Sequence, residues 1–598
     1  MIAAGVVFVY LAIVLYVGVF AFRGKSTGKE EFFVANRSLG TFVFLLSLFG
    51  SNMTSFAILG SSGLAFRQGI GVYGLMASIS GIVIPMSIFL IGTRLWSIGK
   101  RFGHITQVQI LRDRFEMGHI GTVVFVLQAV MLVPYIIIGV MGGGETLEGV
   151  SGGAVPYWFG GLIVAAVVMG YVFFGGMRGT AWVNTVQTLM FLVFGGIAFL
   201  IIARGMGGLG ATIQAMVGTL EKAKDMPVEA GKPSPVLTSD GALLTRDRIP
   251  FWYFASYAFI PLSSIMFPHI AIFCLTAKKL ASFRKTVIFY PLCIMAIWLP
   301  SVFLGAVAGG RVEVTAALAA KNPSFAQFEQ KFPVAASTVK RLVAGEIKAD
   351  DPAALALWKP PVKPELRRLA SENADGAMLE MLTIYSPTIL AGLLGAAIMA
   401  CVMASDSQIL ALSTMFGEDV FAFYGGRRRY GERAEVWAAR CFVVLAAVAA
   451  YVIALVVHQH ANIFEIAIQF AFSGYASMAP IMLACLFWRR ATKWGVLAST
   501  LWVAACLVGF GVLQARTTPP ASATAPPIPI WKIGDTVILV REYVRISFTE
   551  ARVLLVAPMF IGSAVLMVVF SLLTRPPSAQ TLERYFPRGG AIPATPAD

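Results

Sequence analysis

Residues 386–421, with the sequence SPTILAGLLGAAIMACVMASDSQILALSTMFGEDVF, form an apolar segment with one acid, Asp406, near its middle. A segment of this length and hydrophobicity predicts a helix that crosses a membrane. A carboxylate at bilayer depth costs several kcal/mol unless it faces a partner, an ion or water, so an acid there is by default part of a functional site. Asp406 is therefore the first candidate site residue.

The composition of the whole chain indicates a membrane protein. Its 598 residues are 57% hydrophobic and 13% charged, and its mean hydropathy of +0.77 is too high for a water-soluble protein. Apolar runs of about 20 residues, the length that crosses about 30 Å of hydrocarbon, recur along the chain. They predict an all-α protein with thirteen spans, at 3–22, 40–66, 71–96, 118–143, 157–174, 181–204, 250–276, 285–309, 386–421, 436–457, 463–488, 493–513 and 551–574.

The loop charges predict the orientation of these spans. The loops after the first, third, seventh, ninth and eleventh spans are rich in Lys and Arg, whereas the short loops between them contain almost none. This alternation predicts an N-terminus outside and a C-terminus in the cytoplasm of a bacterial-type plasma membrane. We assign the net charge of +16 to this orientation and to anionic lipid of the bilayer, and not to nucleic acid.

Catalytic and metal-binding motifs are missing from the sequence. The six cysteines lie in or beside the apolar runs without metal-ligand spacing, so no disulfide framework and no metal site are predicted. The chain has no Ser/His/Asp arrangement and no phosphate loop. A membrane-embedded enzyme is therefore disfavoured, and no organic cofactor is expected.

The second span contains a polar interruption. Gly50, Ser51, Asn52, Thr54 and Ser55 follow one another in the middle of an apolar helix. Backbone in a bilayer can leave helical geometry only where protein or an aqueous cavity satisfies it, so this cluster predicts a broken helix that lines a cavity. The alternative is that these small residues only allow neighbouring helices to approach closely.

The seventh span is interrupted in a similar way, by Pro261, Ser263, Ser264 and Pro268. Two interrupted helices five spans apart are typical of inverted repeats that hold a binding site between them near the membrane midplane. His269 follows the last of these prolines, and two roles are open for it, a proton carrier or a packing and hinge residue.

Several motifs in order along the chain carry a resemblance to a known family. They are FFVANRSLG (32–40), LVPYIIIGVMGGG (132–144), GGMRGTAWVNTVQ (175–187), FPHI (267–270), ACVMASDSQILALSTMFGEDV (400–420) and APIMLACLFWRRATKWG (479–495). Over nearly its whole length the chain resembles the sodium:solute symporter family, which includes bacterial proline, pantothenate, sialic-acid and sugar transporters. The resemblance implies a LeuT-type core of ten helices in two inverted repeats, working by alternating access.

The resemblance also implies an organisation into regions. These are an extra helix and cytoplasmic loop (1–39), a first repeat (40–204), an outer loop (205–249), a second repeat (250–495) with an outer loop (310–385), and a C-terminal part (496–598). The loop 310–385 is either a lid or a surface excursion. In the C-terminal part, the proline-rich stretch 514–550 has no readable function, and the tail after Arg575 is predicted to be disordered.

A sodium site follows from the resemblance. In the family, the principal site uses carbonyl groups that fall here on Gly50, Met53 and Ala400, together with two adjacent hydroxyl residues. Those hydroxyl positions hold Met403 and Ala404 in this chain. Because a hard cation prefers oxygen ligands and neither side chain has one, this departure leaves the coupling ion open between sodium and a proton.

A second cation site, known in some members of the family, falls on Asn184, Asp406 and Ser407. Three roles are open for Asp406. It could ligate sodium together with the other two residues, bind and release a proton during the cycle, or pair with a neighbouring helix without carrying an ion.

The resemblance places the solute at the interrupted second span. The candidate solute-binding residues are Asn52, Thr54, Ser55, Ser263, Ser264 and His269. No Lys or Arg is evident at mid-span, which weakens an anionic solute held by direct charge pairing. We therefore predict cation-coupled symport of a small organic solute, sodium being the first choice of cation. The alternatives are a proton-coupled symporter that uses Asp406 and a transporter-like sensor without coupled flux.

Overall fold

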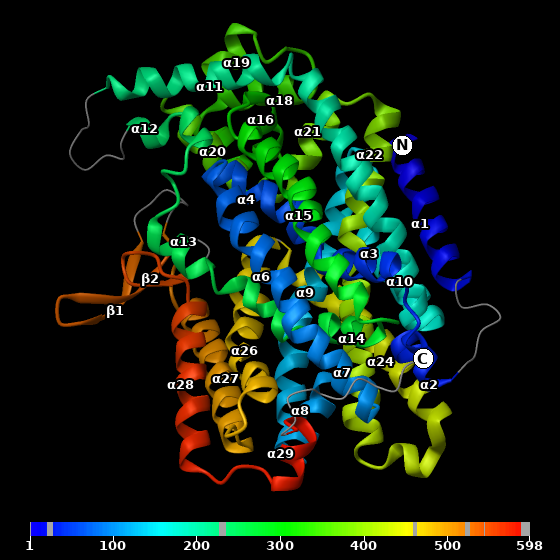
Figure 1. The fold of residues 1–598 in the computed structure, drawn as a ribbon. Coiled ribbons are helices and arrows are strands. Elements are labelled where there is room, and N and C mark those ends of the chain that lie inside the picture. The colour runs from blue at the N-terminus through cyan, green and yellow to red at the C-terminus, as the bar shows by residue number, and fades with distance from the viewer. Residues whose placement is uncertain are drawn as a thin grey trace.

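The computed structural model describes residues 2–20, 28–226, 235–458, 463–520, 527–542 and 545–587, and most of them are helical (Figure 1). Ten helical segments are long and apolar enough to cross a membrane. They are α1 (Ile2–Phe20), Gly71–Phe102 including α6 (Ile79–Ser87) and α7 (Thr93–Phe102), α9 (Ile120–Ser151), α10 (Tyr157–Gly205), α15 (Ala281–Ala308), Thr388–Ala422, α24 (Gly426–Val457), Ala467–Phe487 ending in α26 (Ser473–Phe487), α27 (Lys493–Arg516) and α28 (Val556–Leu573).

Two further spans are bent pairs of helices. The first joins α3 (Thr41–Asn52) to Phe56–Gln68, which consists of η2 (Phe56–Gly60) and α4 (Ser61–Gln68), at an angle of 59°. The second joins Phe251–Ile265, which contains α13 (Phe251–Tyr257) and η6 (Ile260–Ile265), to α14 (Pro268–Thr276) at 46°. The bends fall at the two polar interruptions of the sequence, so the prediction of two broken helices is confirmed.

The longest helix, α10, is a hairpin of two spans. At 49 residues it would reach about 70 Å if straight, more than twice the hydrocarbon thickness. It turns at Gly176, whose φ of 51° favours glycine. A Cβ atom at Gly179 would lie only 3.6 Å from the carbonyl oxygen of Tyr171, although eight residues of straight helix extend about 12 Å. With α10 counted as two spans, the described residues contain thirteen candidate spans, the number predicted from the sequence.

The remaining helices gather at the two ends of the bundle (Figure 1). At the lower end of the figure lie α2 (Lys29–Val34), α8 (Gln107–Phe115) and α29 (Ala579–Tyr585). At the upper end lie α11 (Leu209–Lys224), α12 (Pro235–Thr238), α16 (Val312–Ala320), α17 (Phe325–Lys331), α18 (Pro333–Val343), α19 (Pro352–Ala356), α20 (Val362–Glu372) and α21 (Ala377–Tyr385). The chain begins near the upper end and α29 lies at the lower end, as an odd number of spans requires.

The two long loops of the upper end form one packed layer. Asp240, between α12 and η5 (Gly241–Leu244), accepts hydrogen bonds from Trp358 Nε1 at 2.7 Å and from Lys363 and Arg367 of the other loop. The segment 310–385 is therefore folded and tied to 205–249.

Asp375, in η7 (Ala374–Gly376), connects this layer to the membrane helices. Its Oδ2 accepts a hydrogen bond at 2.6 Å from the backbone N–H of Ile463, at the start of α25 (Ile463–Ile466). A Cβ atom at Gly63 of α4 would lie 2.9 Å from the Cα of Asp375, so the layer packs directly on the upper half of the first bent span. Burial raises the pKa of the Asp375 carboxyl to about 6, against the lowering effect of Arg67.

We expect the titration of Asp375 to lower the stability of the protein as the pH rises from about 4 to about 6. In this window the folded chain keeps a proton on Asp375 that the unfolded chain has already released, so the free energy of unfolding falls by up to about 3 kcal/mol. Thermal unfolding across this pH range measures the loss, and Asp375→Asn should flatten it. An equal pH dependence in both proteins would exclude Asp375 as its source.

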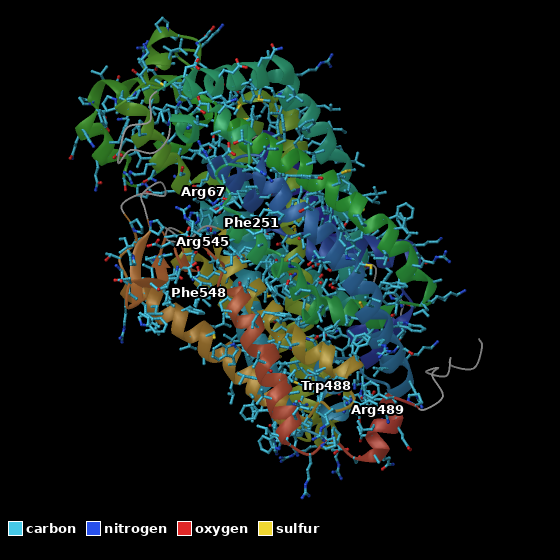
Figure 2. All side chains as sticks on the ribbon, turned by 60° about the vertical axis from the view of Figure 1, so that its left-hand side comes forward. Arg67, Phe251, Trp488, Arg489, Arg545 and Phe548 are labelled. Atoms are coloured by element: carbon cyan, nitrogen blue, oxygen red, sulfur yellow. The ribbon has the colours of Figure 1, made fainter. Side chains whose placement is uncertain are left out.

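A small sheet occupies part of the proline-rich stretch 514–550, which the sequence predicted to be an outer loop without a readable function. Strands β1 (Ile528–Ile533), β2 (Thr536–Arg541) and β3 (Ile546–Phe548) pair antiparallel in that order. Arg545 places its guanidinium 4.3 Å from the ring centre of Tyr253, next to Glu542. Figure 2 labels Arg545 and Phe548 of this region near Phe251, with Trp488 and Arg489 lower in the view. Arg545, which lies between β2 and β3, therefore ties this region to α13.

The C-terminal tail is partly ordered, so the prediction of disorder is wrong for residues 579–585. Helix α29 binds α8 through Asp113, which accepts hydrogen bonds from Tyr585 at 2.7 Å and Arg584 at 3.1 Å. Burial raises the pKa of Asp113, but hydrogen bonds from His104 and Tyr585 outweigh it and lower the pKa to about 2. Ala579, Leu582 and Tyr585 recur at every third position here, so the helix has a face that can dock. Residues 588–598 of the predicted tail lie outside the described residues.

Candidate cation and solute site

Asp406 lies inside the bundle and is fully buried. Its Oδ2 accepts a hydrogen bond from the Tyr171 hydroxyl and its Oδ1 one from the Ser407 hydroxyl, both at 2.9 Å. Asn184 Nδ2 donates to Ser407 Oγ at 2.8 Å and to Asp406 Oδ1 at 3.3 Å. We call Tyr171, Asn184, Asp406 and Ser407 the polar cluster.

The hairpin of α10 builds one side of this cluster. Tyr171 lies before the turn at Gly176 and Asn184 after it, so the two arms bring both side chains to the same carboxylate. Asn184 and Ser407 were predicted from the sequence, whereas Tyr171 was not. The available signal was a hydroxyl in an apolar run, because a buried tyrosine usually finds a hydrogen-bond partner.

The polar cluster is rich in oxygen atoms. Asp406 has two carboxylate oxygens, Ser407 and Tyr171 each have a hydroxyl, and Asn184 has its amide oxygen. Asn184 Oδ1 is buried and has no hydrogen-bond partner within the described part of the chain. A buried acceptor without a donor is unfavourable unless a cation or water contacts it. The donor set therefore suits a small hard cation.

The first bent span lies against this cluster. A Cβ atom at Gly50 would collide with Thr188 Oγ1 and lie 3.1 Å from the carbonyl oxygen of Asn184, so only glycine allows this approach. Gln408 Nε2 donates a hydrogen bond to the carbonyl oxygen of Ser51 at 2.9 Å. Met53 ends α3 in an extended conformation. The bend and the acid-bearing helix are thus in direct contact.

The membrane-spanning helix that carries Asp406 contains a short irregular turn just before this residue. A 3₁₀ turn, η8 (Met403–Ser405), separates α22 (Thr388–Val402) from α23 (Asp406–Met415), and η9 (Phe416–Ala422) completes the span. The tight packing of α9 accompanies the turn, since a Cβ atom at Gly139 would collide with Ser405.

Tyr135 of α9, which was not predicted as a site residue, lies where the two bent spans meet. Its hydroxyl donates to the carbonyl oxygen of Asn52 at 3.1 Å, at the bend of the first span. Its ring stacks on Phe267 at 5.4 Å and lies 5.7 Å from His269, at the bend of the second span. Tyr135 therefore joins both bends, which is where the resemblance predicts the solute.

The other predicted solute residues divide into two groups. Asn52 Nδ2 donates to the Tyr290 hydroxyl at 2.9 Å, Ser55 Oγ donates to the Ile138 carbonyl at 2.6 Å, and Thr54 is buried between them. Neither ring nitrogen of His269 has a hydrogen-bond partner among the described residues, although the side chain is buried.

Ser263 and Ser264 lie apart from this group, in η6, which packs mainly against α26 and α6. Ser264 Oγ donates to the Pro261 carbonyl of the same turn at 2.8 Å. Their role opposite Asn52 therefore stays a prediction.

A second polar network, also missed from the sequence, joins the lower end of the acid-bearing span to α8. Arg112 NH2 donates to the Asp419 carbonyl at 2.9 Å, and Thr106 Oγ1 donates to Asp419 Oδ2 at 2.8 Å. Glu418 forms an ion pair with Lys29 of α2. It forms a second ion pair, at 2.8 Å, with Arg427 of α24. These contacts tie four elements together below the polar cluster.

At the cation site that the resemblance predicts, Tyr171→Phe should weaken sodium binding about tenfold to a hundredfold, because a hydrogen bond to a charged group contributes about 1.5–3 kcal/mol. The sodium concentration at half-maximal uptake measures the loss. Tyr135→Phe is the matched control, since it removes a hydroxyl near the solute position and should change the half-maximal solute concentration instead. Equal sodium dependence in wild type and Tyr171→Phe would exclude the tyrosine from cation binding.

The protein has helices that are long and apolar enough to cross a membrane, and two bent helices meet near a buried carboxylate. These features define a polytopic membrane protein of the transporter type. The sequence model of the sodium:solute symporter family matches residues 32–339 and 355–502. The chain belongs to this family. Because the family consists of transporters, the prediction of a transporter and not an enzyme is confirmed.

Individual relatives agree with this membership. The chain is 23% identical over 593 residues to the sodium/proline symporter of Escherichia coli (strain K12), covering 96% of this chain and 94% of that protein. It is 25% identical over 281 residues to the sodium/pantothenate symporter of the same organism, covering 47% of this chain. That second match spans only about half of the relative, 54% of its length.

A solved structure has the same fold. A Na+-coupled sialic acid symporter in a substrate-bound outward-open state superimposes with a TM-score of 0.63 at 13% identity, covering 96% of this chain and 98% of that chain. The predicted all-α membrane fold with a LeuT-type core is therefore confirmed.

Proposed function

We propose that the protein is a secondary active transporter that couples the entry of sodium to the uptake of a small organic solute by alternating access. One observation carries this proposal. A buried carboxylate, Asp406, accepts a hydrogen bond from Asn184, whose amide oxygen is buried and has no partner among the described residues, and the backbone of Asn184 packs against Gly50 at the bend of the first span. Relatives named as sodium/proline and sodium/pantothenate symporters support sodium as the cation.

The cation would be held by the polar cluster together with backbone carbonyl groups of the first bent span. The proposed cation-binding residues are Gly50, Met53, Asn184, Ala400, Met403, Ala404, Asp406 and Ser407, of which Met403 and Ala404 have no side-chain oxygen to offer. Tyr171 adds a hydroxyl from another helix. We infer that this hydroxyl and the Asp406 carboxylate replace the two hydroxyl residues that the family has at 403 and 404.

The proposed cycle follows from where the cation would bind. Sodium would hold both arms of α10 and the acid-bearing helix against the bend at Gly50. A ligand can shift a conformational equilibrium only by binding one state better than the other. Sodium would therefore stabilise the state in which the bend is ordered, and the solute would bind there, against Asn52, Thr54, Ser55 and His269, before the path opens to the other side.

Uptake into proteoliposomes tests the coupling. A solute panel should be offered under a sodium gradient, a proton gradient and no gradient. Accumulation under the sodium gradient alone supports the proposal, and accumulation under the proton gradient alone supports proton coupling through Asp406. Specific solute binding without accumulation under any gradient would replace the proposal with a sensor.

We also infer that the upper end of Figure 1 faces outward and the lower end faces the cytoplasm, because the basic loops belong to the lower end. The five spans from 40 to 204 and the five from 250 to 495 would then form the two inverted repeats. A membrane-impermeant thiol reagent applied to intact cells checks the orientation, since it should label a cysteine introduced at Glu329 and spare one introduced at Glu583.

A further inference from the structure

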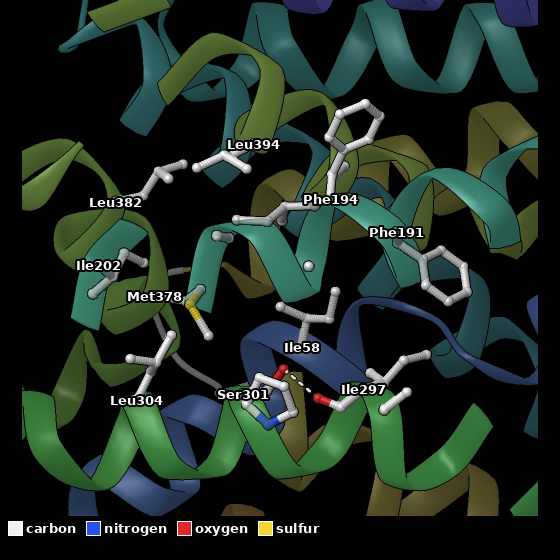
Figure 3. Close-up of a pocket in the computed structure, with 16 residues that line it drawn as sticks. Ile58, Phe191, Phe194, Ile202, Ile297, Ser301, Leu304, Met378, Leu382 and Leu394 are labelled. Atoms are coloured by element: carbon white, nitrogen blue, oxygen red, sulfur yellow. Dashed lines mark hydrogen bonds between the residues drawn. The ribbon is translucent and has the colours of Figure 1, made fainter. Parts of the chain in front are cut away.

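An open apolar cavity lies between α10, α15, α21 and α22, away from the polar cluster, and its empty space of about 510 Å³ includes the volume at its mouth (Figure 3). Phe191, Phe194 and Ile202 line it from the second arm of α10, Ile297 lines it from α15, and Leu394 lines it from α22. Its inner wall includes Ile58, in the turn that follows the bend of the first span. The cavity therefore touches both the bent span and the helix that leads to Asp406.

The lining of the cavity is chemically uniform. It contains no charged residue and only one hydroxyl, that of Ser301. Ser301 Oγ already donates a hydrogen bond to the Ile297 carbonyl at 2.9 Å, as Figure 3 shows. A polar solute would lose its hydration here without a hydrogen bond in return. The occupant that suits these walls is a hydrocarbon chain.

The cavity is continuous with a surface that faces lipid. On α10 its lining residues alternate with exposed apolar ones, Val193 and Leu200, which are 56% and 65% exposed. On α15 the neighbouring Met295 and Leu299 are also exposed, at 47% and 46%. Exposed apolar faces of this kind on membrane-spanning helices meet acyl chains in a bilayer. A lipid tail can therefore reach the cavity without crossing water.

We propose that this cavity binds one acyl chain of a phospholipid from the adjoining leaflet. The chain would pack between α10 and α15 and contact Ile58 and Leu394. Because these residues belong to the two elements that meet near Asp406, the bound chain would support their packing. The lipid would thus be a structural ligand of the transporter, distinct from the solute and the cation.

Native mass spectrometry of the purified full chain, released from detergent micelles after extraction from phospholipid vesicles, tests the proposal. Wild type should retain one phospholipid. Ala198→Trp fills the cavity and should reduce retention at least tenfold, whereas Ala449→Trp, the same change at an exposed position of α24, should leave it unchanged. If Ala198→Trp does not fold, Gly195→Leu offers a second filling variant, because a Cβ atom there meets open space.

Equal phospholipid retention by wild type and a folded filling variant would overturn the proposal. Retention of only detergent or of a free fatty acid, which the adduct mass distinguishes from a phospholipid, would overturn it as well. None of these readouts depends on transport, so failure here leaves the proposed symport untouched.

Discussion

Asp406→Asn should abolish the stabilisation of the protein by sodium and, with it, sodium-driven uptake. Asparagine keeps the shape of the side chain and can still contact Tyr171 and Ser407, so the fold should survive. The charge that balances the cation is lost. Breaking a buried charge pair costs about 3–5 kcal/mol, which corresponds to a loss of sodium affinity of roughly 150-fold to 5,000-fold.

The thermal midpoint with and without sodium measures this directly, since a ligand that binds only the folded state raises it with concentration. Wild type should shift upward with sodium, and Asp406→Asn should not. Asp419→Asn makes the same chemical change on the same span at the lower end, outside the polar cluster, and should keep the sodium-dependent shift. A normal shift in Asp406→Asn would assign that acid to packing and remove it from cation binding.

Much of the fold could be read from the sequence because membrane helices are determined locally. The length of the apolar runs predicted the spans, and clusters such as Gly50–Ser55 and Pro261–Pro268 predicted the bends. The two adjacent glycines at 175 and 176 predicted the turn of α10. The strands at 528–548 could not be predicted, because three short strands beside a proline-rich stretch carry little pattern.

Only part of the candidate site could be predicted from the sequence. Asn184, Asp406 and Ser407 were named from the sequence and lie within hydrogen-bond distance of one another. Tyr171 and Tyr135 were not predicted, because their contacts with the site depend on which helices face each other. In the sequence, a tyrosine within an apolar run looks the same whether its hydroxyl contacts a site or its ring only packs between helices. The 3₁₀ turn at Met403–Ser405 was missed for a similar reason, since no glycine or proline within it marks the change.

Arg112→Ala should destabilise the protein by about 3–5 kcal/mol, the largest single effect on stability that we expect. Arg112 is 9% exposed and Asp419 is fully buried, and the arginine also contacts Thr122 at 2.9 Å and the ring of Phe423 at 3.8 Å. Removal of the arginine leaves the Asp419 carboxylate buried with a single hydroxyl partner, Thr106. An uncompensated buried charge is more costly than the loss of an exposed pair.

The matched control is Arg584→Ala, which removes an arginine from Asp113 at the same end of the molecule. That pair is 3.1 Å apart but partly exposed, so its loss should cost no more than about 1 kcal/mol. Denaturant or thermal unfolding in detergent compares the two variants. A double variant, Arg112→Ala with Asp419→Asn, removes the unpaired charge and should recover part of the lost stability. Equal losses in Arg112→Ala and Arg584→Ala, or no recovery in the double variant, would show that α8 is not held to the acid-bearing span by this buried pair.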